Sequence, residues 1–314
     1  MAPKILCVVG PTACGKTALG VALAKQLDGE VVSADSMQIY RGMTIGTAAP
    51  TAEEMEGVPH HMIAVADPAE NWSAARYAAA ATAVVDDILR RGKLPILVGG
   101  TGLWLDAVVK GHGFAAGHSG GEIRKQLQAR LKSEGMAPLW AELEAVDPAA
   151  AARLHPEDEK RVLRALEVYL ETGRTITQHN EATRALPPRY DAVWIGLQFA
   201  DRQDMRRLIC ARVDRMVEAG LLEEVERLLS SGVPRDATAL QAIGYKEFLG
   251  VAEGQLTAAE AIEAVKLRSC QYAKRQLTWL RKNSAIHWIY WEKERDIARA
   301  LRISTEILTA EGLC

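Results

Sequence analysis

The clearest chemical signal in the sequence lies near its start, where a glycine-rich stretch joins two apolar segments. The apolar run 4–9 precedes it, and residues 18–27, which have the apolar spacing of a helix, follow it. The stretch consists of Gly10, Pro11, Thr12, Ala13, Cys14, Gly15, Lys16 and Thr17. A strand, a loop of this pattern and a helix form a P-loop, whose backbone amides converge on a phosphate group. We therefore expect a phosphate site, in which Lys16 adds a positive charge and the Thr17 hydroxyl can reach Mg²⁺; an ordinary strand–helix turn is the alternative.

A carboxylate stands at the end of the next expected strand, residues 29–35. Beside a bound phosphate, Asp35 can orient Mg²⁺ or accept a proton from a second substrate. A role in capping the following turn is the alternative. Gln38 and Tyr40 are close enough in sequence to help frame whatever Asp35 acts on.

The alternation of strand and helix patterns places these groups together. It predicts a parallel sheet with helices on both faces, and such sheets bind ligands at the carboxyl ends of their strands. The loop 10–17, Asp35 and a second glycine turn, 99–101, all follow expected strands. They should therefore share one crevice, where the Thr101 hydroxyl would contact a substrate or only cap the next helix.

The wider pattern is that of an α/β protein with a helical insertion. Further strands are expected at 94–98, 190–197 and 286–291, and helices at 75–91, 102–109, 203–219, 221–230, 257–280 and 294–308, whereas 46–74 reads as irregular. Between 111 and 188 the strand signal disappears, and helices are expected at 122–134, 137–146 and 158–171. We therefore expect a core domain of residues 1–110 and 189–314, with a P-loop NTPase-like parallel sheet flanked by helices, and a helical insertion domain, 111–188.

The composition is that of an ordinary globular protein. The 314 residues are 48% hydrophobic and 25% charged, and no apolar run approaches the roughly 20 residues of a membrane helix. The five cysteines have no CxxC spacing, and His60-His61 has no third ligand at a familiar distance in sequence. Neither a disulfide framework nor a zinc site is expected, and the expected compartment is the cytoplasm, because no signal-peptide pattern precedes the first strand.

Positive charge is concentrated locally, although the formal net charge is only −2. The segment 266–282 contains six basic residues and no acidic ones, which indicates a contact with phosphates or a solvated helix face. Arg161 and Arg164 share a helix face and allow the same two interpretations. Trp279 fits a core position better than a base-stacking platform, and 241–246 could present a glycine turn with polar neighbours.

Six stretches together resemble one family, the tRNA dimethylallyltransferases, which include the bacterial tRNA isopentenyltransferases. They are Gly-Pro-Thr-Ala-x-Gly-Lys-Thr at 10–17, Asp-Ser-Met-Gln-Ile-Tyr at 35–40, Gly-Gly-Thr-Gly-Leu at 99–103, Arg-Ala-Leu-Glu-Val at 164–168, Gln-Ala-Ile-Gly-Tyr-Lys-Glu at 241–247 and Ala-Lys-Arg-Gln-Leu-Thr-Trp-Leu-Arg at 273–281. The P-loop alone is shared by many families, whereas this combination is highly specific.

The resemblance implies transfer of a dimethylallyl group from its diphosphate to N6 of the adenosine at position 37 of tRNA, next to the anticodon. It implies that the loop 10–17, including Lys16 and Thr17, binds the diphosphate with Mg²⁺ and Arg212, and that Asp35 accepts the N6 proton or holds the amine. The target base would leave its stack at a cost of about a few kcal/mol.

The resemblance and the basic segments also indicate where the RNA would bind. The expected tRNA contacts are Asp35, Ser36, Met37, Gln38, Thr101, Arg124, Lys160, Arg161, Arg164, Gln241, Gly244, Tyr245, Lys246, Lys274, Arg275, Gln276, Thr278, Trp279 and Arg281. The expected partners are the anticodon stem-loop of tRNA and dimethylallyl diphosphate, with no membrane, and the expected state is a monomer.

The chain departs from the family pattern at Cys14, where serine is usual, and at Trp104, where tyrosine is usual. Neither change removes an amide of the loop, but we expect the Cys14 thiol to react with thiol reagents unless diphosphate protects it. Two other functions remain open. One is a small-molecule or nucleoside kinase, which also pairs a P-loop with a carboxylate, and the other is a non-catalytic RNA-binding GTPase or ATPase in which Asp35 only orders Mg²⁺.

Overall fold

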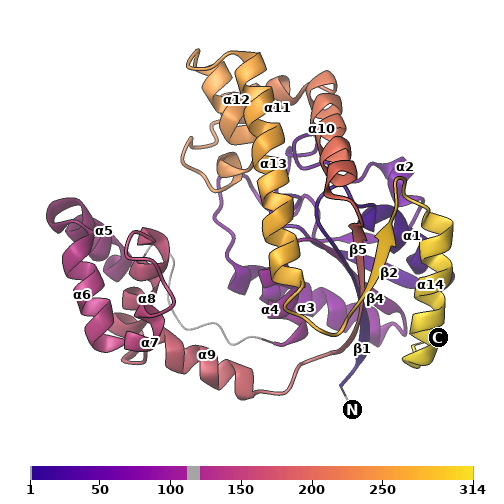
Figure 1. Ribbon diagram of the computed structural model, residues 1–314, viewed down its shortest axis with the longest axis horizontal. Coiled ribbons are helices and arrows are strands. Elements are labelled where there is room, and N and C mark those ends of the chain that lie inside the picture. Colours follow the sequence, from indigo (N-terminus) through magenta and orange to yellow (C-terminus); the bar gives the residue numbers. More distant parts are fainter. Residues whose placement is uncertain (1, 112–120, 314) are drawn as a thin grey trace. The chain divides into compact units, whose positions relative to one another are not determined.

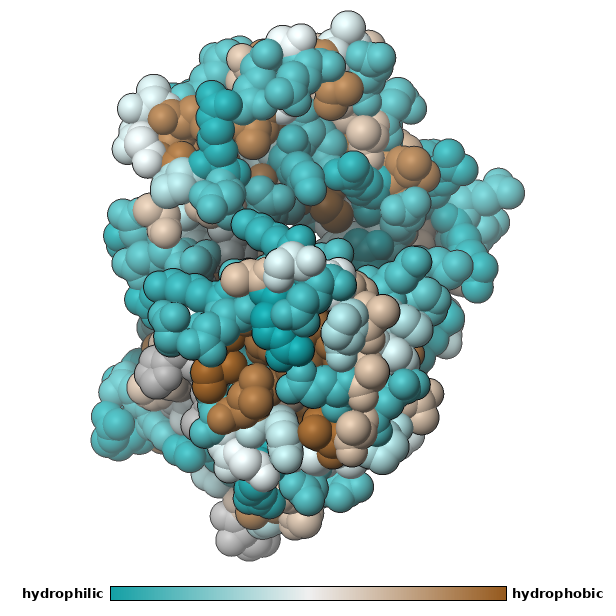
Figure 2. Space-filling model, turned by 90° about the vertical axis from the view of Figure 1, so that its left-hand side faces the viewer, coloured by the Kyte–Doolittle hydropathy of each residue, from teal (hydrophilic) through white to brown (hydrophobic). Residues whose placement is uncertain are grey.

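The computed structural model describes residues 2–111 and 121–313, which form two compact units. The first unit contains the chain up to Val109 together with the segment from Arg189 onward, and the second is Lys110–Pro188. Within the described ranges no helix is long and apolar enough to cross a membrane. Hydrophilic side chains cover most of the face shown in Figure 2.

The first unit is built on a six-stranded parallel sheet with the strand order β3-β2-β4-β1-β5-β6 (Figure 1). Its strands are β1 Lys4–Val9, β2 Gly29–Ala34, β3 His60–His61, β4 Leu94–Gly99, β5 Asp191–Phe199 and β6 Ile286–Trp291. The predicted α/β fold with a parallel sheet is confirmed. The short strand β3 lies in the segment that we expected to be irregular, and it pairs with β2 through Val31↔His60 and Val32↔His61.

The register of the sheet aligns the ends of three strands. Gly99 on β4 is paired with Val9 on β1 and with Ala34 on β2. The loop after β1, Asp35 after β2 and the glycine turn after β4 therefore leave the sheet at the same level. This alignment explains why groups distant in sequence meet at one edge.

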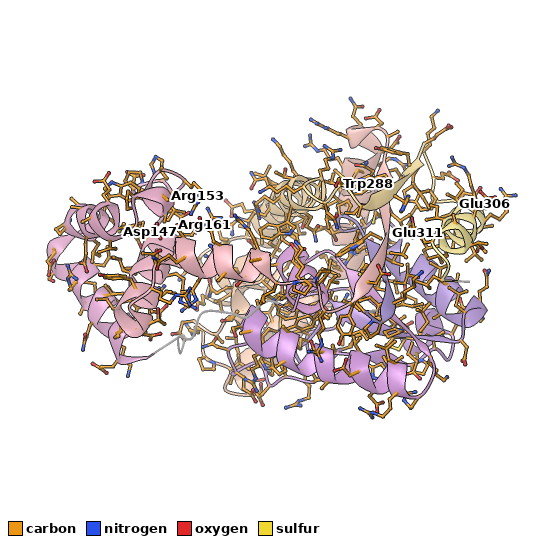
Figure 3. All side chains as sticks on the ribbon, turned by 90° about the horizontal axis from the view of Figure 1, so that it is seen from below. Asp147, Arg153, Arg161, Trp288, Glu306 and Glu311 are labelled. Carbon is orange, nitrogen blue, oxygen red and sulfur yellow. The ribbon has the colours of Figure 1, made fainter. Side chains whose placement is uncertain are left out.

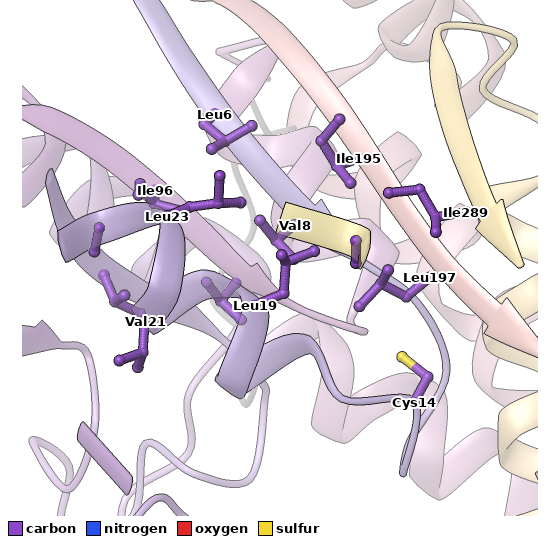
Figure 4. Packing of buried hydrophobic residues seen from close by; sticks show 14 of the residues in the cluster. Leu6, Val8, Cys14, Leu19, Val21, Leu23, Ile96, Ile195, Leu197 and Ile289 are labelled. Atoms are coloured by element: carbon purple, nitrogen blue, oxygen red, sulfur yellow. The ribbon is translucent and has the colours of Figure 1, made fainter. Parts of the chain in front are cut away.

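Helices cover both faces of the sheet. Those of the first unit are α1 Lys16–Gln26, α2 Ala52–Met55, α3 Ala74–Arg90, α4 Gly102–Val109, α10 Arg202–Glu218, α11 Leu221–Ser230, η1 Ala239–Gln241, α12 Tyr245–Ala252, α13 Ala258–Leu280 and α14 Ile297–Ala310. On one face Leu6 and Val8 of β1 pack against Leu19 and Leu23 of α1, as Figure 4 shows. On the other face Tyr77 of α3 is buried and its hydroxyl donates to the Ser33 carbonyl at 2.8 Å.

Within its described residues, the regular secondary structure of the second unit consists of helices. Its helices are α5 Glu122–Glu134, α6 Met136–Val146, α7 Pro148–Ala151, α8 Glu159–Thr172 and α9 Ile176–Ala185, of which α7 and α9 were not expected. Leu127, Leu139 and Leu166 belong to its own hydrophobic core. The buried Asp147 carboxylate joins α7 to α9, because it accepts hydrogen bonds from the backbone and the hydroxyl of Thr177 at 3.0 and 2.7 Å.

A buried ion-pair cluster ties the edge of the sheet to the end of α3. The Glu30 carboxylate on β2 is almost fully buried and accepts hydrogen bonds from Arg91, from Nη1 at 2.5 Å and from Nη2 at 2.7 Å. His61 on β3 contacts the same carboxylate through Nε2 at 2.8 Å. The hydrogen bonding from Arg91 lowers the pKa of Glu30 to about 2, although burial opposes this shift.

Replacing Arg91 with alanine should lower the free energy of unfolding, because the buried Glu30 carboxylate loses its main partner and keeps only His61 and, at 3.7 Å, Lys93. The pKa of Glu30 in the folded state lies below its ordinary value of 4.5. The stabilisation should therefore be complete above about pH 5 and fade as the pH falls toward about 2. Urea unfolding at several pH values measures both effects. The control is Glu56→Gln, which removes an exposed pair with Lys25 and should cost less than about 1 kcal/mol; an equal loss in the two variants would contradict the prediction.

Candidate functional site

The loop between β1 and α1 has the backbone of an anion-binding turn. Gly10 has φ 152°, and a Cβ there would lie 2.3 Å from the Leu197 carbonyl oxygen, so only glycine fits. Gly15 caps α1 with φ 90°, which directs the first amides of the helix toward the loop. The Lys16 ammonium donates to the Pro11 carbonyl at 2.6 Å and so lies over the loop. The local geometry suits a phosphate group.

A cavity of about 340 Å³ opens beside this loop in the first unit. Many of the residues that line it are ones that the sequence singled out: Thr12, Lys16, Thr17, Asp35, Ser36, Met37, Gln38, Arg212, Gln241, Arg275 and Gln276. Apolar side chains such as Ile63, Val213 and Met216 complete the walls. The structure therefore brings the phosphate loop, a carboxylate, two arginines and an apolar surface into one space.

Asp35 serves both the turn and the cavity. Its Oδ1 accepts hydrogen bonds from the amides of Met37 at 2.9 Å and Gln38 at 3.4 Å, which is the capping role that we considered. Within residues 2–111 and 121–313, its Oδ2 makes no hydrogen bond, and the side chain lines the cavity. One carboxylate oxygen thus fixes the side chain while the other can accept a proton or a hydrogen bond from a ligand.

Arg212 of α10 supplies positive charge from the wall of the cavity. Its Nη2 donates to the Thr47 carbonyl at 3.2 Å. Burial lowers the pKa of Arg212, and the negative charge of Asp35 opposes this shift. An arginine guanidinium does not lose its proton in proteins, so Arg212 carries a positive charge. Arg212 can therefore attract an anion bound at the loop.

Thr101 links two of the aligned strand ends. Its hydroxyl oxygen accepts a hydrogen bond from the Ser36 amide at 3.2 Å, and its own amide donates to the Ala34 carbonyl at 3.2 Å. The structure thus assigns Thr101 a role in holding the turn that carries Asp35. Thr101 is not among the residues that line the cavity, whereas Gly99 of the same turn is.

Tyr272 of α13 is a cavity residue that the sequence analysis missed. Burial and, to a lesser extent, the charge of Asp35 raise its pKa to about 12, so the hydroxyl stays protonated at neutral pH. The guanidinium of Arg275 lies 5.6 Å from the centre of its ring. The sequence could have indicated Tyr272, because it lies four residues before Gln276 and residues at this spacing share a helix face.

A buried carboxylate that we did not expect holds another wall of the cavity. Glu224 of α11 accepts hydrogen bonds from the amides of Thr44 at 2.9 Å, Ile45 at 2.9 Å and Gly46 at 3.0 Å. The Tyr245 hydroxyl donates to it at 2.5 Å. These four donors compensate the desolvation of the charge. The loop that they fix continues into Thr47 and Ala48, whose carbonyls hold Arg212 and Gln38.

Three expected RNA contacts are instead parts of the interior. Tyr245 is 0% exposed and bonded to Glu224, and Gly244 beside it is also buried. Gln276 is 5% exposed and accepts a hydrogen bond from the Thr12 amide at 2.9 Å. They do not belong to the exposed surface of the protein, although Gln276 also lines the cavity. Gln241 and Lys246, from the same stretch as Tyr245, are exposed.

The other face of α13 is exposed and basic. Near its C-terminal end the exposed residues include Lys274, Arg275, Thr278 and Trp279, and Arg281 follows the helix. Trp279 is 42% exposed, against our expectation of a core position, and its Nε1 donates to Asp106 at 3.0 Å. Arg281 donates to Gln198 at 3.0 Å. This face offers cations and a fixed aromatic ring to an anionic partner.

The second unit gathers the remaining expected cations. A cavity of about 380 Å³ is lined by Lys160, Arg161 and Arg164, and also by Arg153, which the sequence analysis missed. Figure 3 shows Arg153 and Arg161 on neighbouring segments of this unit. The buried Glu167 fixes Arg164 at 2.8 Å and lies 3.8 Å from Arg124. These cations are therefore grouped as in a site for phosphates.

The expected reactivity of Cys14 does not agree with its position. Its side chain is 0% exposed and belongs to the hydrophobic core around Leu197 (Figure 4). A Cβ at Gly10 would lie 2.7 Å from its sulfur, which shows how tightly the loop closes over it. A thiol reagent cannot reach this sulfur while the loop is closed. In this chain the cysteine acts as a small apolar residue beneath the loop.

Tyr245→Phe should lower the free energy of unfolding by about 2 kcal/mol, because Glu224 loses one of the donors that compensate its burial. Chemical unfolding at pH 7 measures the loss. The matched control is Tyr290→Phe, at a half-exposed tyrosine on β6, which should change stability by less than about 0.5 kcal/mol. Equal effects in the two variants would show that Glu224 does not depend on Tyr245.

The chain matches known proteins over nearly its whole length. Residues 38–283 match the family model described as IPP transferase. The tRNA dimethylallyltransferase of Halalkalibacterium halodurans is 47% identical over 290 residues, which cover 92% of this chain and 91% of that protein. The tRNA dimethylallyltransferase of Geobacillus kaustophilus is also 47% identical over 290 residues, with coverage of 92% and 90%.

Solved structures share the fold as well. The tRNA isopentenylpyrophosphate transferase of Bacillus halodurans is 42% identical with a TM-score of 0.72, covering 98% of this chain and 96% of that one. A eukaryotic dimethylallyltransferase acting on tRNA is 28% identical with a TM-score of 0.82, covering 98% and 80%. By sequence and by fold, the chain belongs to the IPP transferase family, among the tRNA dimethylallyltransferases.

Proposed function

We propose that this protein transfers a dimethylallyl group from dimethylallyl diphosphate to N6 of adenosine 37 in the anticodon stem-loop of tRNA. The observation that carries the proposal is the cavity in which Lys16, Asp35 and Arg212 meet beside an apolar wall. An alkyl diphosphate needs cations for its head and an apolar surface for its tail, and the acceptor amine needs a base. The names of the relatives favour tRNA prenylation over a kinase.

The loop and the two cations would hold the diphosphate. Amides at the start of α1, the Lys16 ammonium and the Arg212 guanidinium would hydrogen-bond to its oxygens and stabilise the charge that develops as it leaves. Thr17 and Asp35 both line the cavity, and a hydroxyl and a carboxylate are oxygen ligands of the kind that suits Mg²⁺. Bound with the diphosphate, Mg²⁺ would neutralise part of its charge.

Asp35 would act on the nucleophile. The N6 amine attacks the allylic carbon, the bond from that carbon to the diphosphate oxygen breaks, and the diphosphate leaves with the bonding electrons. The free Oδ2 of Asp35 then accepts the N6 proton, while its Oδ1 is held by the turn amides of Met37 and Gln38. The base must be turned out of its stack to reach this oxygen.

The exposed cations would bind the RNA backbone. Lys274, Arg275 and Arg281 in the first unit and the cations around Arg164 in the second are two separate groups, and each can pair with phosphates. We further propose that the protein acts as a monomer in the cytoplasm, where unmodified tRNA is available.

The direct test combines the protein with unmodified tRNA, Mg²⁺ and dimethylallyl diphosphate labelled in the allyl group. Label should enter the RNA, and nuclease digestion should recover it on adenosine 37. A parallel reaction with ATP labelled in the γ-phosphate tests the kinase alternative. Transfer of the γ-phosphate to a small acceptor, with no label in RNA from the allyl donor, would exclude the proposed function.

Asp35→Asn should reduce kcat by about 10²–10⁴-fold, because the amide keeps the shape of the side chain but cannot accept the proton. Binding of tRNA should change little. Single-turnover transfer and a filter-binding assay measure the two effects separately. Normal turnover together with lost tRNA binding would contradict the assignment of Asp35 as the base.

Charge reversal of Arg275 and Arg281 to glutamate should weaken tRNA binding and reduce its dependence on salt concentration, because fewer counterions are released. Binding titrations at several salt concentrations give the slope. Arg302→Glu on α14, at an exposed position outside both groups of cations, is the matched control. An unchanged slope in the double variant would exclude this face from the RNA interface.

A further inference from the structure

One amide of the phosphate loop already has a partner within the protein. The Thr12 backbone N–H donates to Oε1 of Gln276 at 2.9 Å, across 264 residues of sequence. Gln276 is 5% exposed and lines the same cavity as Lys16 and Thr17. The Gln276 oxygen thus accepts the hydrogen bond that the Thr12 amide of a P-loop would otherwise donate to a phosphate.

The surroundings of Gln276 show that this contact is built into the fold. A Cβ at Gly100 would lie 2.1 Å from Gln276 Nε2, so the absence of a side chain at Gly100 provides the space for the amide group. On α13, Ala273, Gln276, Leu277 and Leu280 are buried, which fixes the face that carries the glutamine. The Gln276 side chain of α13 therefore lies against the glycine turn after β4 and from there reaches the phosphate loop.

The position of Thr12 in the loop determines which phosphate compounds the hydrogen bond to Gln276 disfavours. Lys16, Thr17 and the α1 amides lie at one end of the loop, and Thr12 lies toward the other. A diphosphate at the helix end would leave Thr12 without a contact, whereas a third phosphate that extended along the loop would reach Thr12, which lines the same cavity. There it meets an amide that is already bonded, together with the partial negative charge of the Gln276 oxygen.

We propose that Gln276 is a specificity-determining residue that restricts the loop to a diphosphate and disfavours a third phosphate. This proposal rests on the proposed function only in that the loop binds the diphosphate. It explains how a P-loop, whose pattern alone suggests a nucleoside triphosphate, can serve an alkyl diphosphate. A residue that only braced the loop would affect the binding of both anions equally.

The test compares the affinities of inorganic diphosphate and inorganic triphosphate, each with Mg²⁺, by calorimetric titration of the full chain. Wild type should prefer diphosphate. Gln276→Ala frees the Thr12 amide and removes the repelling oxygen, so the preference should fall by about tenfold, as for a hydrogen bond to a charged group. Gln276→Glu replaces a partial charge by a full one and should weaken triphosphate binding more than diphosphate binding. Gln271→Ala, at an exposed glutamine of the same helix, should leave the preference unchanged.

An unchanged ratio of the two affinities in Gln276→Ala would overturn the proposal, as would a wild type that binds both anions equally. If thermal unfolding shows that the alanine variant does not fold, Gln276→Glu decides, and an unchanged ratio in that variant also overturns the proposal. The measurement needs neither RNA nor an allyl group. Failure of prenyl transfer with a retained preference for diphosphate would therefore count against the proposed function alone.

Discussion

Three parallel strands of the first unit end in one row, because Gly99 of β4 is paired both with Val9 of β1 and with Ala34 of β2. A different group follows each strand end at this level: the phosphate loop, Asp35 and the turn at Thr101. The hydrogen bonds from Thr101 to Ala34 and from Ser36 to Thr101 then lock two of these ends together. A shift of one residue in this register would turn the side chains of a strand to the opposite face and separate the groups.

Helices from the second half of the sequence complete the site that the strand ends begin. Arg212 on α10 and Gln276 on α13 reach the cavity beside the loop, and Glu224 on α11 fixes the wall that holds Arg212. The cavity therefore requires both segments of the first unit, before Val109 and after Arg189. The second unit is inserted between them, and its core of Leu127, Leu139 and neighbouring residues is its own.

The sequence alone was sufficient to predict those parts of the structure in which the local residue pattern and the chemistry lead to the same conclusion. The strand 4–9, the loop and the helix after it have their own turn and cap signals, and the ends of parallel strands could be placed at one edge by rule. Gln276 and Tyr245 were expected to contact tRNA because they belong to the family motifs, and Cys14 was expected to react because it lies near a helix N-terminus, whereas tertiary packing buries all three side chains. The strand β3 has only two residues and depends on pairing with β2, so no pattern within 46–74 could reveal it.

The helix α13 shows how one element can serve two ligands of the same charge. Its 3.6-residue period separates the buried Ala273, Gln276 and Leu277 from the exposed Lys274, Arg275 and Thr278. The buried face places a neutral oxygen on the phosphate loop, whereas Lys274 and Thr278 are exposed on the other face. Arg275 lies between the two, because it is exposed and also lines the cavity beside the loop. Adjacent residues in the sequence point to different surroundings, so one helix supplies groups both to the phosphate loop and to the outer surface.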